Sequence, residues 1–201
     1  MKLRAYALVM VMFCAIALGC APQKMAQEGG EAVPLAHVFA EITRQYQGVD
    51  SLQAQASLKL EVQGEYYVLQ GPFLYKNPDS LRMRFAVSLG PTVGDIIYTN
   101  GLLQVLLPSE GKLYRGRLQE SSSLFLTMRF QDYQDAKAGR FPMSISGDLE
   151  AIGLRFELRM KEPQINRPFP PGAFAPGQTA WKVYPLADLK EFLAGKMESR
   201  P

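Results

Sequence analysis

The feature that most constrains the fold of this chain is a series of short segments in which apolar and polar residues alternate. In the clearest one, residues 53–62, the apolar positions are Ala54, Ala56, Leu58, Leu60 and Val62. A period of two places successive side chains on opposite faces of a β-strand, so the segment predicts a strand with one buried and one wet face. The same alternation in residues 80–89 and 153–161 predicts β structure over much of the chain.

Turn signals separate the predicted strands. Asn77-Pro78-Asp79 predicts a turn, and Asn100-Gly101 predicts a two-residue type I′ hairpin. Gly71-Pro72 predicts a bend or bulge inside one strand. The predicted strands are residues 53–62, 66–75, 80–89, 95–99, 102–107 and 112–117. Short strands joined by tight turns form an antiparallel meander, so we expect a barrel or a strongly curved sheet.

Helical patterns lie before and after these strands. A first helix is predicted between Pro34 and Gly48, because one stripe at helical spacing holds Leu35, Val38, Phe39, Ile42 and Tyr46. The alternation fails at residues 121–136 and predicts a second helix, capped by Ser122 or Ser123, with an apolar face of Leu124, Phe125, Met128 and Ala136.

The C-terminal part combines β segments with proline-rich chain. β character returns at residues 143–161, and five prolines between Pro163 and Pro176 exclude a central strand beyond it. Residues 166–177 therefore predict an irregular segment, and Trp181–Tyr184 predicts a last strand. A short amphipathic C-terminal helix is indicated by Leu186, Leu189, Phe192, Leu193 and Met197.

The first 20 residues predict export and a lipid anchor. Lys2 and Arg4 precede an apolar run from Ala5 to Leu18, which is the pattern of a secretory signal. A bilayer span needs about 20 apolar residues, so this run is short for a permanent membrane helix. Residues 17–20, Ala-Leu-Gly-Cys, resemble the lipobox of bacterial lipoproteins, with the first two residues exchanged. The alternative is an ordinary secreted protein cut at a nearby small residue.

The lipobox resemblance implies that signal peptidase II cuts before Cys20, whose sulfur carries a diacylglyceryl group. Each buried methylene contributes about 0.8 kcal/mol, so two or more acyl chains would hold the protein in the membrane. Residue 21 is Ala and not Asp. By the sorting rule of enterobacteria, this implies a lipid anchor in the outer membrane, on its periplasmic face. Both cysteines lie at or before residue 20, so we expect no disulfide in the mature chain.

Composition and motifs argue against several classes of function. Removal of the signal takes Lys2 and Arg4 and no acidic residue, which lowers the net charge from +3 to +1 and disfavours nucleic-acid binding. His37 is the only histidine and has no neighbouring Cys or His, which disfavours a metal site. No Ser lies in a G-x-S-x-G elbow, and Gly90–Gly94 lacks the Lys-Ser or Lys-Thr of a phosphate loop. We expect no enzyme activity, catalytic residue, metal or cofactor.

The apolar face of the predicted sheet has two interpretations. It forms a solid core, which is the default for a sheet with one dry face, or it lines a half-open barrel with room for acyl chains. Both need the same residue types, so the sequence pattern leaves both open. The candidate cavity residues are Leu58, Leu60, Phe73, Met83, Phe85, Val87, Phe156 and Leu158.

The order of motifs resembles the LolA/LolB superfamily of lipoprotein-sorting proteins. The resemblance extends from about Val38 to Pro176. It rests on residues 54–58, residues 77–85, Leu89-Gly90-Pro91, the Asn100-Gly101 hairpin, Leu106-Leu107-Pro108 and Tyr114-Arg115-Gly116. Because the chain has its own lipobox, it looks more like the LolB-type outer-membrane receptors than the soluble LolA-type carriers.

The resemblance implies a mainly β (α+β) fold, an unclosed antiparallel β-barrel with helices as a lid. The domains are then a signal peptide (1–19), a lipidated Cys20 with a flexible tether (20–33), the barrel (34–184) and a C-terminal tail (185–201). The resemblance also implies that the barrel binds acyl chains of other lipoproteins and helps insert them in the outer membrane, with a periplasmic LolA-like carrier as a candidate partner. Chains of about 16 carbons each cost on the order of 10 kcal/mol to expose to water, so they must pass directly between apolar cavities.

The same resemblance assigns membrane contact to the loop between the third and fourth strands. That loop begins with Leu89 and has Val93 as a candidate helper, whereas the alternative is that Leu89 packs under its own hairpin. The arginine that latches the lid of the carriers cannot be placed here, and Arg82 and Arg84 are expected on a solvated face. The alternative function is a structural or assembly lipoprotein of the outer membrane, which uses the same fold with a filled interior to bind a protein partner.

Overall fold

The computed structural model describes residues 31–34, 37–46, 48–62, 64–87, 90–117, 125–136, 139–149, 153–177, 180–189 and 191. Within these residues eleven strands form one sheet. The strands are β1 (Glu31–Pro34), β2 (Ser51–Val62), β3 (Glu65–Lys76), β4 (Ser80–Ala86), β5 (Thr92–Thr99), β6 (Leu102–Leu107), β7 (Lys112–Arg117), β8 (Phe125–Ala136), β9 (Gly139–Leu149), β10 (Leu154–Ile165) and β11 (Lys182–Pro185).

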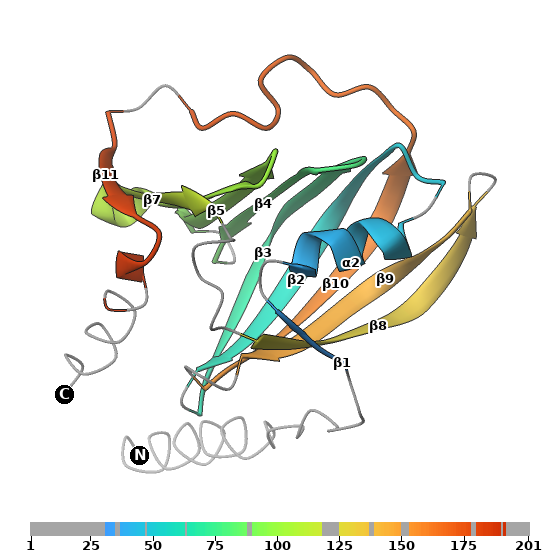
Figure 1. Ribbon diagram of the computed structural model, residues 1–201, viewed down its shortest axis with the longest axis horizontal. Coiled ribbons are helices and arrows are strands. Elements are labelled where there is room, and N and C mark those ends of the chain that lie inside the picture. Colours follow the sequence, from blue (N-terminus) through green and yellow to red (C-terminus); the bar gives the residue numbers. More distant parts are fainter. Residues whose placement is uncertain are drawn as a thin grey trace, which may run out of the picture.

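The sheet is antiparallel and unclosed. Its strand order is β1-β8-β9-β10-β2-β3-β4-β5-β6-β7-β11, with β1 and β11 at the two edges (Figure 1). Every neighbouring pair runs antiparallel except β11, which pairs in parallel with β7. Beside the strands, the described residues include the helix α2 (Val38–Gln45) and the short 3-10 helix η2 (Pro108–Glu110). The predicted mainly β fold, an open and curved antiparallel sheet, is confirmed.

The strands β6 and β7 were predicted most accurately, because the residues of the adjoining turns determine where they begin and end. Strands β6 and β7 have the predicted bounds, and the hairpin between β5 and β6 contains Asn100 (φ 51) and Gly101 (φ 78). A type I′ turn needs positive φ at both central residues, which Asn and Gly tolerate better than other residues. The next turn contains η2 and ends at Gly111 (φ 63), another left-handed position.

The helix predicted at residues 121–136 is wrong, because residues 125–136 form strand β8. β8 pairs with β1 on one side and with β9 on the other. Leu126 and Met128 are buried and Phe130 is half-buried against them, which is the period of a strand. Burial on one face and pairing with distant strands outweigh the weak helical spacing of Phe125 and Met128. The proposed caps Ser122 and Ser123 lie outside the described residues.

The N-terminal helix is shorter than predicted. Pro34 does not open it but ends strand β1, which pairs with β8, so part of the segment expected to be a tether belongs to the sheet. α2 begins at Val38, is followed by Tyr46 as its C-cap, and precedes Gly48 (φ 80). The predicted apolar stripe is correct for Val38, Ile42 and Tyr46, which are all buried.

Strand β10 continues past the first proline that was expected to end it. Its register against β2 shifts between Lys161 and Gln164, and Glu162 there has φ 53. A bulge at this place accommodates Pro163, which has no N–H for the ladder. The irregular segment at residues 166–177 is confirmed.

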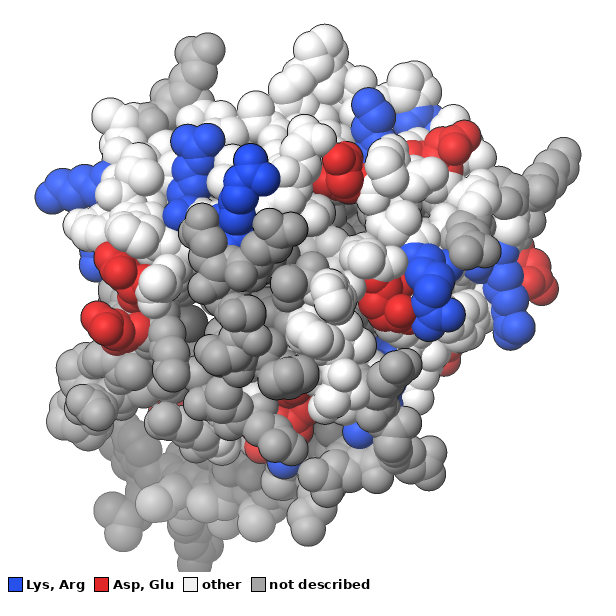
Figure 2. Space-filling view, viewed as in Figure 1, with Lys and Arg blue, Asp and Glu red and all other residues white. Residues whose placement is uncertain are grey.

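The sheet has an inner face, which α2 covers, and an outer face. On β2 the inner residues Leu52, Ala54, Ala56 and Leu58 are buried, whereas Gln53 and Gln55 between them are exposed. The outer face carries solvent-exposed ion pairs such as Arg155 with Asp148, 3.0 Å apart. On the side shown in Figure 2, basic and acidic side chains are interspersed among the described residues.

The C-terminal end returns to the sheet as β11, close to the predicted last strand. Most of the predicted C-terminal helix lies outside the described residues. Among the residues that are described, no helix is long and apolar enough to cross a membrane.

Candidate functional site

The candidate site is the inner face of the sheet, which is apolar from β8 across to β4. Strands from both halves of the sequence contribute side chains to one cluster together with α2. The buried members of this main cluster are Val38, Ile42, Tyr46, Val49, Leu52, Ala54, Ala56, Leu58, Phe73, Tyr75, Leu81, Phe85, Leu126, Met128, Phe141, Ile145, Leu158 and Met160. An apolar surface that extends over this many strands is the kind of surface that an acyl chain needs.

Helix α2 lies over this face (Figure 1). It contacts strands on either side of the middle of the sheet, β5 and β9. On the β5 side, the rings of Phe39 and Tyr98 stack with centroids 3.5 Å apart. On the β9 side, the hydroxyl of Tyr46 donates to the Pro142 carbonyl at 3.1 Å. The Thr43 hydroxyl also donates to the carbonyl of Pro78 in the β3–β4 turn at 2.7 Å. The helix therefore bridges the sheet in the position of a lid.

Little space remains between α2 and the sheet. A small crevice lies there, lined among others by Phe39, Ile42, Tyr75, Leu81 and Tyr98, and it is too small to hold a water molecule. Pockets that hold small ligands measure about 300–1,000 Å³. In this conformation the side chains of α2 occupy the surface that a ligand would contact, so acyl chains need α2 to move away.

Among the described residues, the buried polar groups of the main cluster around α2 are the tyrosine hydroxyls of Tyr46 and Tyr75. Burial raises the pKa of Tyr46 far above its ordinary value and also raises the pKa of Tyr75. Both phenols therefore remain neutral hydrogen-bond donors at any physiological pH. A neutral surface favours an apolar ligand over an ionic one.

Most of the predicted cavity residues meet in the main cluster. Leu58, Phe73, Phe85 and Leu158 are buried in it, and Leu60, Met83 and Phe156 are half-buried against it. Val87 differs, because it follows the end of β4 and is 42% exposed.

The predicted membrane-contact residues are only partly described. Val93 lies in β5 and packs against the main cluster, so its side chain contributes to the core. Leu89 and the predicted lipidation site Cys20 lie outside the described residues.

Three aromatic residues that matter for this face were not among the predicted cavity residues. Tyr46, Tyr75 and Phe141 are among its largest fully buried side chains, and the ring of Tyr46 packs against the other two at the C-terminal end of α2. Their positions in the alternating and helical patterns were visible in the sequence. Their convergence was not, because it depends on the pairing of β9 with β10 and of β10 with β2.

Arg82 and Asp95 form a buried ion pair on the outer face, so the expectation of a solvated Arg82 is wrong. The two side chains are only 10% and 5% exposed. Arg82 donates from Nε to Asp95 Oδ1 at 3.0 Å and from Nη2 to Asp95 Oδ2 at 2.6 Å. Arg84 also contacts Asp95, at 3.2 Å. Its side chain is 47% exposed, which agrees with the expected solvated position.

Arg82 is buried because residues 166–177, here called the strap, cross the outer face above it. Arg82 Nη1 donates to the carbonyl oxygens of Ala173 at 2.7 Å and Ala175 at 3.1 Å. At the other end of the strap, the Asn166 N–H donates to the Ser51 carbonyl at 2.8 Å. The Ser51 hydroxyl donates to the Arg167 carbonyl at 2.7 Å. The strap is thus attached to β2 and to β4.

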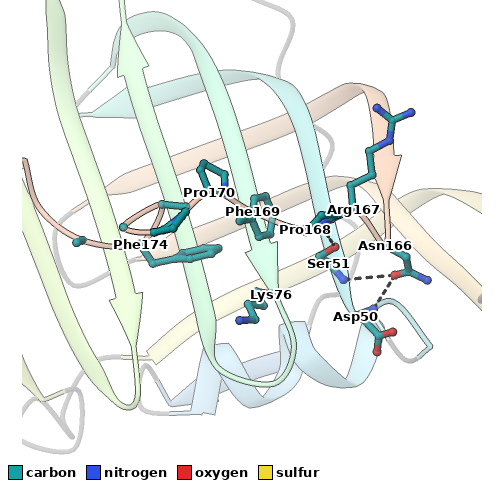
Figure 3. Close-up of a pocket in the computed structure, with 13 residues that line it drawn as sticks. Asp50, Ser51, Lys76, Asn166, Arg167, Pro168, Phe169, Pro170 and Phe174 are labelled. Carbon is teal, nitrogen blue, oxygen red and sulfur yellow. Dashed lines mark hydrogen bonds between the residues drawn. The ribbon is translucent and has the colours of Figure 1, made fainter.

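Between these attachments the strap forms a groove with the ends of β2 and β3. The groove has a volume of about 760 Å³. Figure 3 shows Phe169 and Phe174 along the strap where it crosses the sheet, and the Arg167 side chain extending away from them. The rings of Phe169 and Phe174 pack edge to face with centroids 5.2 Å apart.

Within the described part of the chain, no group of three or more His, Cys, Asp and Glu side chains is placed to hold a metal ion. His37 is exposed at the N-cap of α2 and makes no side-chain capping hydrogen bond.

Neither the protein-family models nor the curated proteins compared with this chain give a match. Solved structures do match by shape. A domain described as that of an outer membrane lipoprotein-sorting protein from Vibrio parahaemolyticus has a TM-score of 0.50 and 9% sequence identity, covering 68% of this chain and 94% of its own. A DUF1329 family protein from Desulfovibrio piger has a TM-score of 0.50 and 7% identity, covering 70% of this chain and 97% of its own.

A LolA superfamily protein from Nitrosomonas europaea is also similar, with a TM-score of 0.48 and 11% identity, covering 74% of this chain and 100% of its own. At sequence identities this low, the two matches with a TM-score of 0.50 show the fold alone and leave function to be argued from the site. The chain therefore has the open-sheet fold found in the lipoprotein-sorting domain from Vibrio parahaemolyticus.

Proposed function

We propose that this protein is a lipid-anchored lipoprotein that binds the acyl chains of other lipoproteins on its inner face and helps insert them in the outer membrane. The observation that carries the proposal is the apolar inner face, which the short helix α2 covers. The lipobox-like sequence before Cys20 supports it, and so does the fold shared with a lipoprotein-sorting domain. A LolA-like carrier in the periplasm is the partner that would supply the acyl chains.

The energetics allow an acyl chain to displace α2. A buried side chain such as Val38, Ile42 or Tyr46 contributes about 1.5–3 kcal/mol, so the three together hold the helix by several kcal/mol. A chain of about 16 carbons gains about 12 kcal/mol on complete burial, at about 0.8 kcal/mol for each methylene. A chain that would otherwise be exposed to water therefore outcompetes the helix for the same apolar surface, and the inner face stays covered while no chain is bound.

Membrane attachment in this proposal depends on Cys20, and membrane contact during delivery depends on Leu89. Both assignments rest on the sequence. Mass spectrometry of the mature N-terminus tests the anchor, with a diacylated or triacylated Cys20 as the expected result. An unmodified Cys20, or a cut at another residue, would contradict it.

Weakening α2 is expected to increase acyl affinity. Phe39→Ala removes the stack on Tyr98, so the uncovered state becomes more populated and binds ligand more tightly. We expect the dissociation constant for dansyl-undecanoate to fall about tenfold, which corresponds to about 1.4 kcal/mol less stabilisation of the covered state. The measurement is a fluorescence titration of the chain from Ala21 onward, which keeps every residue of both hydrophobic clusters.

The matched control is Tyr66→Ala. Tyr66 lies on the outer face of β3 and is 54% exposed, so its removal should leave the affinity unchanged. If neither the wild type nor Phe39→Ala binds the probe while both are folded, the proposal fails. The small crevice under α2 would then favour the alternative, a structural or assembly lipoprotein that binds a protein partner.

A further inference from the structure

The ladder between β3 and β4 is interrupted. The ladder passes from Gln70↔Ala86 directly to Phe73↔Met83, which leaves Gly71 and Pro72 outside it. By contrast, β2 and β3 pair without a break from Ser51↔Lys76 to Val62↔Glu65. Pro72 has no N–H to donate, and an interrupted ladder bends more easily than a continuous one. We call this interruption the β3–β4 seam; it separates the long strands (β8, β9, β10, β2 and β3) from the short strands β4–β7.

Both faces of the sheet carry an element that bridges this seam. On the inner face, α2 contacts β9 through Tyr46 and β5 through Phe39. On the outer face, the strap is attached to β2 through Asn166 and to β4 through Arg82.

We propose that the sheet flexes at the β3–β4 seam to uncover the inner face, and that Arg82 and Asp95 are positioning residues that hold it curved by latching the strap. This inference rests on the proposed acyl-binding function. When a curved sheet flattens, two points on its outer face approach each other. The strap contains Pro168, Pro170, Pro171 and Pro176, whose φ angles are fixed. It must therefore bow outward, and its carbonyl groups leave Arg82.

The contacts of Arg82 allow two discrete states of the strap, latched and released. In the latched state, the planar guanidinium of Arg82 contacts the Asp95 carboxylate and two strap carbonyls at once. Release of the strap costs those two carbonyl hydrogen bonds but leaves the ion pair with Asp95 intact. The Arg82 side chain is on the outer side of β4, while its neighbours Leu81 and Met83 belong to the inner cluster. A movement of β4 therefore shifts side chains on both faces of the sheet.

The test compares Arg82→Lys with Arg84→Lys. Lysine keeps the positive charge opposite Asp95 but lacks the planar fork that reaches several acceptors. Arg84 lies on the same strand and face and contacts the same carboxylate, so Arg84→Lys is a matched control that leaves the two latch hydrogen bonds in place. Leu113→Val, a core change on β7 in the separate cluster of Ile97, Leu106 and Leu113, controls for a general loss of stability.

Two readouts are needed. Hydrogen exchange without ligand reports on the strap amides Ala173 and Ala175 and on the seam amides Phe73 and Met83. Stopped-flow fluorescence reports on the association rate of dansyl-undecanoate. For Arg82→Lys we expect about tenfold faster exchange at both places, as for the loss of one hydrogen bond, and a similar increase in the association rate. The two controls should match the wild type in both.

Unchanged strap exchange in Arg82→Lys would show that Arg82 is not the latch. Faster strap exchange with unchanged seam exchange would show that strap and seam are not coupled, and either result overturns the inference. If the wild type and every variant fail to bind the probe, the proposed function fails, whereas the exchange data still decide whether the latch controls the seam.

Discussion

Asp95→Ala is expected to lower the free energy of unfolding by about 3–5 kcal/mol, the usual cost of removing one partner of a buried ion pair. The Asp95 carboxylate is 5% exposed and accepts two hydrogen bonds from Arg82. Without it, the Arg82 guanidinium stays buried with two strap carbonyls and no negative charge. Urea denaturation followed by the fluorescence of Trp181, the only tryptophan, measures the effect.

The control for this prediction is an exposed ion pair on the same sheet. Asp148→Ala removes the partner of Arg155, which is 44% exposed, and should cost less than about 1 kcal/mol. The double variant Arg82→Met with Asp95→Leu removes both charges and should recover most of the stability lost in Asp95→Ala. A loss for Asp95→Ala no larger than the loss for Asp148→Ala would contradict the role given to the buried pair.

Gly71→Ala is expected to destabilise the protein by about 3 kcal/mol or more, at the upper end of the range for overpacking. A Cβ at Gly71 would lie 1.8 Å from the carbonyl oxygen of Arg84 and 2.9 Å from its carbonyl carbon. Both atoms belong to the backbone of β4, so β3 and β4 would have to separate. Urea denaturation gives the change in stability.

Gly94→Ala is the control for the glycine substitution. Gly94 lies on β5, opposite Phe85 of β4, and a Cβ there would meet no atom within 4 Å. Because its φ is not left-handed, we expect the alanine to be tolerated and to add about 0.5–1 kcal/mol. Equal effects of the two substitutions would mean that the close approach of β3 to β4 does not restrict residue 71.

The sequence predicted the fold best where structure is decided locally. The bounds of β6 and β7 follow from Asn100-Gly101 and from the turn that ends at Gly111, where backbone angles depend on the residues of the turn itself. Residues 125–136 were predicted as a helix because their partners, β1 and β9, are not visible in the local pattern. The burial of Leu126 and Met128 on the inner face favours a strand over a helix here.

The site was predicted only where local alternation determines the position of a side chain. Alternation correctly places Leu58, Phe73 and Leu158 on one face, since a strand has only two faces. It also places Arg82 on the opposite face, but no local signal shows that the strap, about 90 residues later in the chain, covers that position. The packing of α2 against the inner face likewise depends on contacts with β5 and β9.

The most direct measurement is the position at which a bound fatty acid contacts the protein. A palmitate that carries a diazirine is photoactivated with the chain from Ala21 onward, and the labelled residues are identified by mass spectrometry. An acyl-binding inner face predicts labels on Leu58, Met83 and Phe156, and competition by unlabelled palmitate. Labels confined to exposed outer residues such as Tyr66 and Val68, or no label on a folded protein, would contradict acyl binding on the inner face.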